Sequence, residues 1–158
     1  MSSPTPAALP ADPACEFFTS RELPFARDDV FRAWTDARLL RQWWGPDGFT
    51  CTFQEFEPRA GGNWRHVMHG PDGRNYDNYS VFRELTPARI ELAHVSEPRF
   101  DLIVTLTERD GGTHVTFLQR FASPAVRDAV APICIPANEQ NLDRLTRVVR
   151  GEPADVRA

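Results

Sequence analysis

The segment Pro136–Arg150, with the sequence PANEQNLDRLTRVVR, predicts the long helix around which the rest of the chain is organised. Its apolar residues recur at helical spacing and form one stripe, made of Leu142, Leu145, Val148 and Val149. Asn138 is a candidate cap for the start of this helix. Such a helix gains most of its stability by burying its apolar stripe against another element, so the preceding residues should supply a surface for it.

That surface is predicted to be an antiparallel sheet. Six strand-like runs are separated by short turn-rich spacers, which is typical of a meander: Phe49–Glu57, Asn63–His69, Arg74–Leu85, Arg89–Val95, Phe100–Glu108 and His114–Phe121. An earlier run, Phe17–Leu23, ends at a proline and suits an edge strand. Two short helices, over residues 27–36 and 37–44, should follow it, with Asp36 capping the second. The sequence therefore predicts an α+β fold in which a curved sheet of seven antiparallel strands surrounds the long C-terminal helix and leaves space beside it.

Length and composition suit a single soluble domain. The 158 residues suggest a domain over residues 15–150, an N-terminal tail over 1–14 that four prolines make disordered or extended, and a C-terminal tail over 151–158. The net charge of −4 and dispersed arginines argue against a nucleic-acid partner. We expect no membrane span and no secretory signal, and hence a cytoplasmic location. Three widely spaced cysteines predict neither a disulfide nor a metal site, and no motif indicates a cofactor.

The hairpin loop GPDG determines which side chains share a face of the sheet. Pro71 and Gly73 favour a three-residue loop ending in a bulge, which pairs Gly70 with Arg74. A two-residue turn is the alternative, and it would shift every pair by one residue. Under the bulge register, one face carries Trp64, His66, Met68, Tyr76, Asn78, Ser80, Phe82 and Glu84. Because the opposite face carries charged residues in mid-strand, we expect the first face to point inward.

This inner face predicts a ligand pocket, since it combines aromatic and apolar side chains with a few polar groups. Further residues expected at the pocket are Trp43, Trp44, His94 and Asn141. His66 and Glu84 are the candidates for proton transfer. The simpler interpretation is that Asn78 satisfies His66 and that Glu84 meets an arginine or water. His66 and His69 lie on opposite faces of a strand and cannot bind one metal ion.

Three segments of the chain resemble a known family. They are PFARDDVFRAWTDARLLRQWWGPDGFTCT, PRAGGNWRHVMHGPDGRNYDNYSVFRELTPARI and GGTHVTFLQRF, and they resemble proteins related to the activator of heat-shock protein 90 ATPase. That family is a branch of the START-like, or SRPBCC, superfamily, which also contains polyketide cyclases. The likeness extends over residues 17–149 and implies a helix-grip fold with a cavity between sheet and C-terminal helix. It implies no particular reaction.

The first functional hypothesis is a cytoplasmic protein that binds a small, largely apolar ligand in this cavity, without a cofactor. One alternative is a cyclase-type or hydrolase-type enzyme that uses His66 or Glu84 as acid or base. Another is a module that binds a protein partner, such as a chaperone. The edge strand beginning at Phe17 could also pair with a second copy and form a homodimer.

Overall fold

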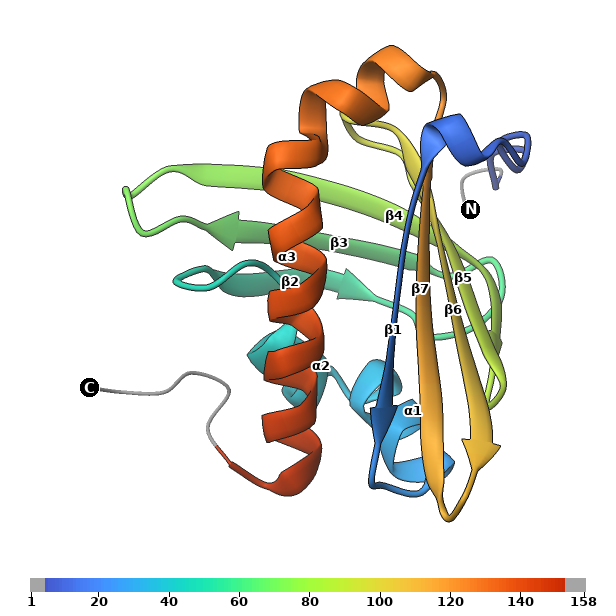
Figure 1. Cartoon of the computed structure of the whole chain (residues 1–158). Helices are drawn as coiled ribbons and strands as arrows, with labels where there is room; N and C mark the ends of the chain where they lie inside the picture. The colour runs from blue at the N-terminus through green and yellow to red at the C-terminus, as the bar shows by residue number, and fades with distance from the viewer. Residues whose placement is uncertain (1–4, 153–158) are drawn as a thin grey trace.

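A seven-stranded antiparallel sheet curves around one long helix (Figure 1). The computed structural model describes residues 5–152. The strands follow the spatial order β1-β7-β6-β5-β4-β3-β2, and their bounds are β1 Glu16–Leu23, β2 Thr50–Phe56, β3 Asn63–His69, β4 Asn75–Thr86, β5 Arg89–His94, β6 Phe100–Arg109 and β7 Gly112–Phe121. The helices are η1 Pro13–Cys15, α1 Arg27–Thr35, α2 Ala37–Trp43 and α3 Pro124–Arg150. The predicted α+β helix-grip architecture is confirmed. The tail residues 1–4 and 153–158 lie outside the described part.

The bulge register of the central hairpin is confirmed. Trp64 pairs with Ser80 and His66 pairs with Asn78 across β3 and β4. Gly73 adopts φ 83° in the loop, a left-handed conformation that glycine adopts without steric cost. The amide of Gly70 donates to the Arg74 carbonyl at 2.8 Å, which closes the three-residue loop. The prediction of which side chains share the inner face of this hairpin therefore holds for β3 and for β4 as far as Phe82.

Beyond Phe82, the prediction that Glu84 shares the inner face is wrong. The pairing of β4 with β5 shifts by one residue between Phe82 and Glu84, so that Glu84 lies opposite Glu91 and Leu85 lies opposite the buried Ile90. A bulge of this kind reverses the alternation of faces along the strand. The carboxylate of Glu84 instead lies 3.6 Å from the guanidinium of Arg89, and its side chain is 45% exposed.

The long helix begins earlier than expected. α3 starts at Pro124, where the Ser123 hydroxyl caps it by accepting a hydrogen bond from the Val126 amide at 3.3 Å. Asn138, the predicted cap, lies inside the helix. Pro132 and Pro136 are also inside it, and each lacks the N–H that would bond one turn back. Figure 1 shows the first part of α3 inclined to the rest, as prolines cause.

The space between sheet and α3 is packed at one end. There the rings of Trp34 and Trp43, from α1 and α2, meet edge to face with centroids 4.8 Å apart. Both rings are fully buried together with Leu142 and Leu145, which lie in the second half of α3. The predicted apolar stripe thus packs against α1 and α2. At the other end of the space, the sheet faces the first half of α3.

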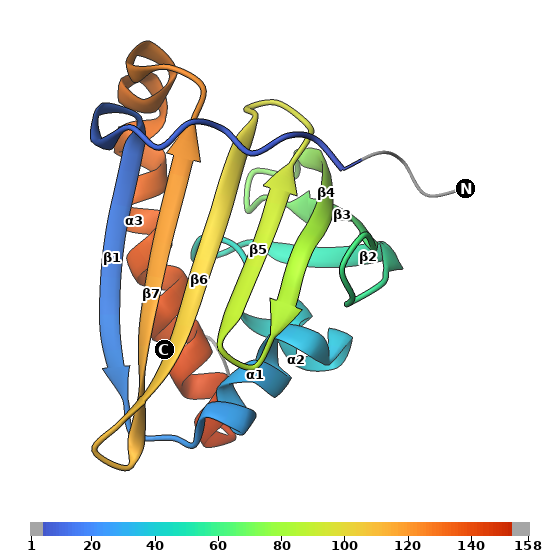
Figure 2. The same cartoon turned by 90° about the vertical axis from the view of Figure 1, so that its right-hand side faces the viewer.

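The N-terminal segment crosses the outer face of the sheet. Figure 2 shows this segment passing over β7, β6 and β5 before it enters β1. The amide of Leu9 donates to the Asp101 carboxylate at 2.8 Å. Arg83 donates to the carbonyls of Pro6 and Ala7, each at 3.1 Å. Asp101 itself is fully buried and accepts from Arg83 at 2.9 Å and from Arg99 at 2.8 Å. These bonds anchor the segment to the face that points away from α3.

Candidate functional site

A cavity of about 270 Å³ lies between the sheet and the first half of α3. Its walls come from strands β3 to β7, from the loop after α2, from the loop between β5 and β6, and from α3. The lining residues are Trp44, Gly45, Pro46, Trp64, His66, Met68, Asn78, Ser80, Leu92, His94, Pro98, Phe100, Leu102, Gln119, Val130, Ile133, Cys134, Ala137, Asn138 and Asn141. Ile133 lines the cavity and is also 69% exposed, so the mouth opens beside the first half of α3.

Most residues expected at the pocket do line this cavity. The eight that do are Trp44, Trp64, His66, Met68, Asn78, Ser80, His94 and Asn141. They come from five separate elements and converge because the sheet curves: β3 and β4 supply five of them, β5 supplies His94, α3 supplies Asn141, and Trp44 caps the C-terminus of α2. The register of the hairpin is therefore what brings the polar groups together.

Four expected residues lie elsewhere. Trp43 is buried against α1, where its indole N–H donates to the Ala33 carbonyl at 3.0 Å. Phe82 packs in the core, parallel to Trp64 with centroids 6.1 Å apart. Tyr76 sits half-exposed near the hairpin tip beside Phe49. Glu84 is on the outer face because of the bulge in β4.

His66 is a buried polar group of the cavity wall. It is only 2% exposed, and its ring stacks on Trp64 with centroids 4.6 Å apart. Neither of its ring nitrogens has a hydrogen-bond partner within residues 5–152. Burial lowers the pKa of His66 to about 3, with a smaller contribution from His94. The imidazole is therefore neutral at physiological pH, and the expected bond from Asn78 to His66 is not formed.

Asn78 contacts His94 instead. The side-chain oxygen of Asn78 lies 2.8 Å from His94 Nε2, while His94 Nδ1 lies 2.8 Å from the Pro98 carbonyl. The Ser96 hydroxyl is 3.3 Å from Nε2 and can donate to it when Nδ1 carries the proton. Burial lowers the pKa of His94, although its hydrogen bonds to the backbone of Pro98 and Ser96 act in the opposite direction. Both histidines of the cavity are therefore uncharged near neutral pH.

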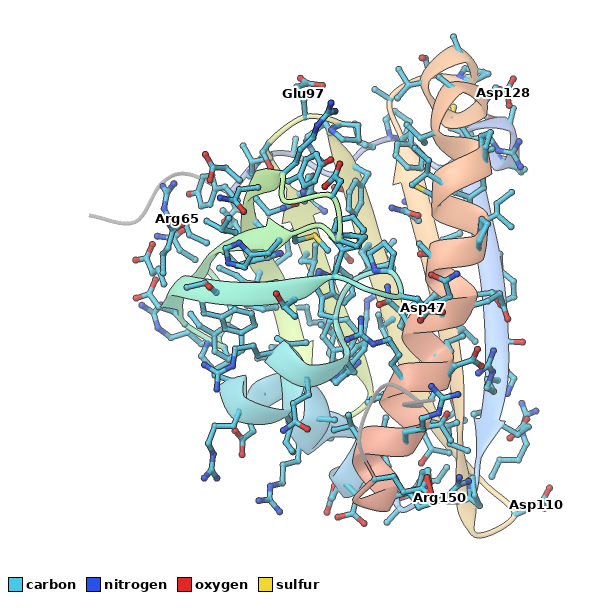
Figure 3. The ribbon with its side chains drawn as sticks, turned by 90° about the vertical axis from the view of Figure 1, so that its left-hand side faces the viewer. Asp47, Arg65, Glu97, Asp110, Asp128 and Arg150 are labelled. Atoms are coloured by element: carbon cyan, nitrogen blue, oxygen red, sulfur yellow. The ribbon has the colours of Figure 1, made fainter. Side chains whose placement is uncertain are left out.

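Amide side chains of α3 join the helix to β7 and to the loop after α2. Asn138 donates to the side-chain oxygen of Gln119 on β7 at 3.1 Å. Asn141 accepts from the Gly45 amide at 2.8 Å, and Gln140 accepts from the Asp47 amide at 3.0 Å. Figure 3 shows Asp47 close beside α3. These bonds fix the loop after α2 as part of the cavity wall.

The buried Arg144 strengthens the same attachment. Its guanidinium donates to the carbonyls of Gly45 at 2.7 Å, Gln42 at 3.0 Å and Pro46 at 3.2 Å. Arg144 lies about one helical turn from Gln140 and Asn141 along α3, so three neighbouring side chains of α3 hold the loop. The charge of Arg144 is directed at backbone oxygens of the loop and not into the cavity.

Sequence reasoning missed the contribution of the first half of α3. Val130, Ile133, Cys134 and Ala137 all line the cavity, and their spacing is helical. The two prolines hid that signal because proline ordinarily interrupts a helix. Burial raises the pKa of the Cys134 thiol, so it stays protonated and is a poor nucleophile.

The described residues contain neither a cluster of metal ligands nor a membrane-spanning helix. No group of three or more histidine, cysteine, aspartate or glutamate side chains is placed to hold a metal ion between residues 5 and 152. Among the helices of the same range, none is both long and apolar enough to cross a membrane.

Comparison with known proteins gives one family and many similar folds. The family model described as "Activator of Hsp90 ATPase homolog 1-like protein" matches residues 24–150. No curated protein matches the chain. A crystal structure of a protein from Nitrosomonas europaea is similar at 20% identity and a TM-score of 0.81, over 90% of this chain and 98% of that one.

Two other solved structures extend this comparison. A protein from Chromobacterium violaceum is 25% identical, with a TM-score of 0.75 over 83% of this chain and 94% of that one. An AHSA1-like protein from Aeromonas hydrophila is 18% identical, with a TM-score of 0.65 over 90% of this chain and 97% of that one. These likenesses show a shared fold.

Proposed function

The chain belongs to the family of Activator of Hsp90 ATPase homolog 1-like proteins, and within that family we propose that it is a ligand-binding protein whose cavity takes a small, largely apolar molecule. The observation that carries this proposal is the cavity itself. About 270 Å³ remain unfilled between sheet and helix, whereas protein interiors are otherwise packed with few voids larger than a water molecule. A mostly apolar lining with a few convergent polar groups is typical of a small-molecule site.

The polar groups of the cavity suit binding better than proton transfer. A general base works best when its pKa is near the operating pH, and that of His66 is about 3. Glu84, the other candidate, is outside the cavity and next to Arg89. Burial raises the pKa of Cys134, so its thiol stays protonated too. We therefore assign His66 a role in contacting the ligand.

The volume limits the size of the ligand. The cavity of about 270 Å³ is close to the lower end of the range for ligand pockets, about 300–1,000 Å³. We therefore expect a compact molecule. Trp44, which is half-buried in the wall, offers an aromatic surface to a ring of the ligand.

Native mass spectrometry of the protein purified from its own host tests the proposal. A bound molecule should add a defined mass, and denaturing extraction should release it. Ser80→Trp should abolish the added mass, because the indole would project from the buried wall into the cavity. The control Arg65→Gln should retain it, since Arg65 lies on the outer face, over the Tyr79 ring, and projects away from α3 in Figure 3.

The opposite result would favour a partner-binding module. If the cavity is empty and a protein co-purifies, with Arg65→Glu but not Ser80→Trp releasing it, the outer surface is the functional site. A chaperone ATPase would then be the first partner to examine, because of the name of the family.

A cytoplasmic location and a homodimer complete the proposal. All three cysteines are free, which suits a reducing compartment. For the dimer, β1 is an edge strand and its Phe18 side chain is 66% exposed, so a second copy could pair with it. Light scattering at high concentration should give twice the 17.9 kDa of the chain; the monomer mass alone would remove the dimer from the proposal.

A further inference from the structure

No charged side chain of the described residues lines the cavity. Among the residues between 5 and 152 that line it, none is aspartate, glutamate, lysine or arginine. The polar members are four amides, one hydroxyl and two imidazoles: Asn78, Asn138, Asn141, Gln119, Ser80, His66 and His94. This is a distinct property of the inner face, because one quarter of the whole chain is charged.

The alternation of the strands explains where the charges go. Arg65 pairs with Glu55 at 3.2 Å on the outer side of the hairpin. Asp101, on β6, is enclosed by two arginines and the N-terminal segment on the outer face. Arg144, in the second half of α3, is directed at three backbone carbonyls of α2 and the loop after it. A charged ligand would therefore meet no opposite charge inside.

We propose that the ligand of this cavity is electrically neutral and presents a group that both donates and accepts hydrogen bonds, such as an amide or a hydroxyl. This inference rests on the proposed ligand-binding function and narrows it. Transfer of an unpaired ion into an apolar site is far more costly than transfer of a neutral polar group that finds a hydrogen bond. Amide side chains donate through NH₂ and accept through C=O, so Gln119, Asn138 and Asn141 match such a group.

The two histidines support the same inference. Their own charged forms are disfavoured by burial, which lowers the pKa of His66 to about 3 and that of His94 as well. An environment that keeps an imidazole neutral also disfavours an anionic or cationic ligand. Because both imidazoles are neutral, they offer an anion no compensating positive charge.

The experiment compares two probes of nearly the same shape, 2-naphthamide and 2-naphthoate, by isothermal titration calorimetry at pH 7.5. The amide is neutral and the carboxylate is an anion. We expect the amide to bind at least ten-fold more tightly. In Ser80→Trp, binding of the amide should be lost, which locates the probe in the cavity.

A pH series separates charge from shape. If only the neutral acid enters, the apparent affinity of 2-naphthoate should rise about ten-fold per pH unit between pH 7.5 and pH 5.5, since a carboxyl with a pKa of about 4 gains neutral form at that rate. The affinity of 2-naphthamide should change less than two-fold over this range. Circular dichroism at each pH confirms that the protein is folded.

A variant should reverse the preference. Gln119→Arg places a permanent positive charge on the inner face of β7, and it should bind 2-naphthoate at least as tightly as 2-naphthamide. Gln119→Met is the matched control and should keep the order of the native protein. If Gln119→Arg does not fold, the pH series on the native protein decides.

The outcomes distinguish the two proposals. Equal binding of both probes, independent of pH and lost in Ser80→Trp, would overturn the neutral-ligand inference and leave the ligand-binding function intact. Binding of neither probe, together with an empty cavity in native mass spectrometry, would overturn the ligand-binding function itself.

Discussion

Replacing His66 with leucine should remove a large part of the acid sensitivity of the fold. The pKa of this histidine is about 3 in the folded protein, against 6.5 for an ordinary histidine, because the ring is buried. Between these two values the unfolded chain binds one more proton than the folded chain does, so stability falls as the pH decreases. From pH 7.5 to pH 5.0, protonation of the unfolded imidazole alone corresponds to about 2 kcal/mol. Leucine carries no proton and should lack this loss.

At pH 7.5 the same substitution should be neutral or stabilising. The two nitrogens of His66 have no partner within the described residues, and a buried polar group without a hydrogen bond costs about 1–3 kcal/mol. Leucine removes that cost and loses the stacking on Trp64, which is worth about 0.5–1.5 kcal/mol. The net change should therefore lie between about −0.5 and about +2.5 kcal/mol, where a positive value favours the variant.

Urea denaturation of both proteins at pH 7.5 and pH 5.0 measures these quantities. His69→Gln, on the outer face of the same strand, is the control and should keep the native dependence on pH. The reasoning is refuted if native protein and His66→Leu lose the same free energy of unfolding between the two pH values. A clear destabilisation of the variant at pH 7.5 would instead show that the imidazole makes a hydrogen bond in solution, to water or to a ligand.

Three further predictions concern the outer face, the hairpin and α3. Asp101→Asn should lower the free energy of unfolding by about 3 kcal/mol, because it leaves two arginines without their buried carboxylate; urea denaturation at neutral pH measures this, and a change below about 1 kcal/mol would contradict it. Gly73→Ala should cost about 1 kcal/mol because of the positive φ at the bulge, and an unchanged thermal midpoint would argue against the three-residue loop. Pro136→Ala supplies the amide hydrogen that α3 lacks there and should slow hydrogen exchange over residues 124–140; equal exchange in both proteins would show that this proline does not weaken the helix.

The hairpin shows what local sequence can predict. Gly73 in GPDG indicates a three-residue loop with a bulge, because glycine readily adopts the positive φ that this loop requires. The loop length sets the register, and the structure shows the predicted pairs Trp64–Ser80 and His66–Asn78. The overall order of elements was equally accessible, since short spacers force neighbouring strands to be antiparallel.

The errors had no comparable marker. The bulge between Phe82 and Glu84 contains neither glycine nor proline, so nothing in the sequence shows that Glu84 changes face. The sequence also did not predict the partner of Asn78. His94 contacts Asn78 from β5, which is not part of the β3–β4 hairpin. Side-chain contacts across non-local pairs depend on the curvature of the whole sheet, which a single hairpin does not specify.

The division of the helix–sheet space into a packed end and a hollow end has an evolutionary consequence. Stability comes mainly from the end where Trp34, Trp43 and Leu145 are fully buried, and the proposed ligand site is at the other end, beside Ile133. Substitutions around the hollow end can therefore alter what is bound while the packed end continues to maintain the fold. Descendants of one ancestral scaffold could in this way acquire different ligands by drift in a few wall positions.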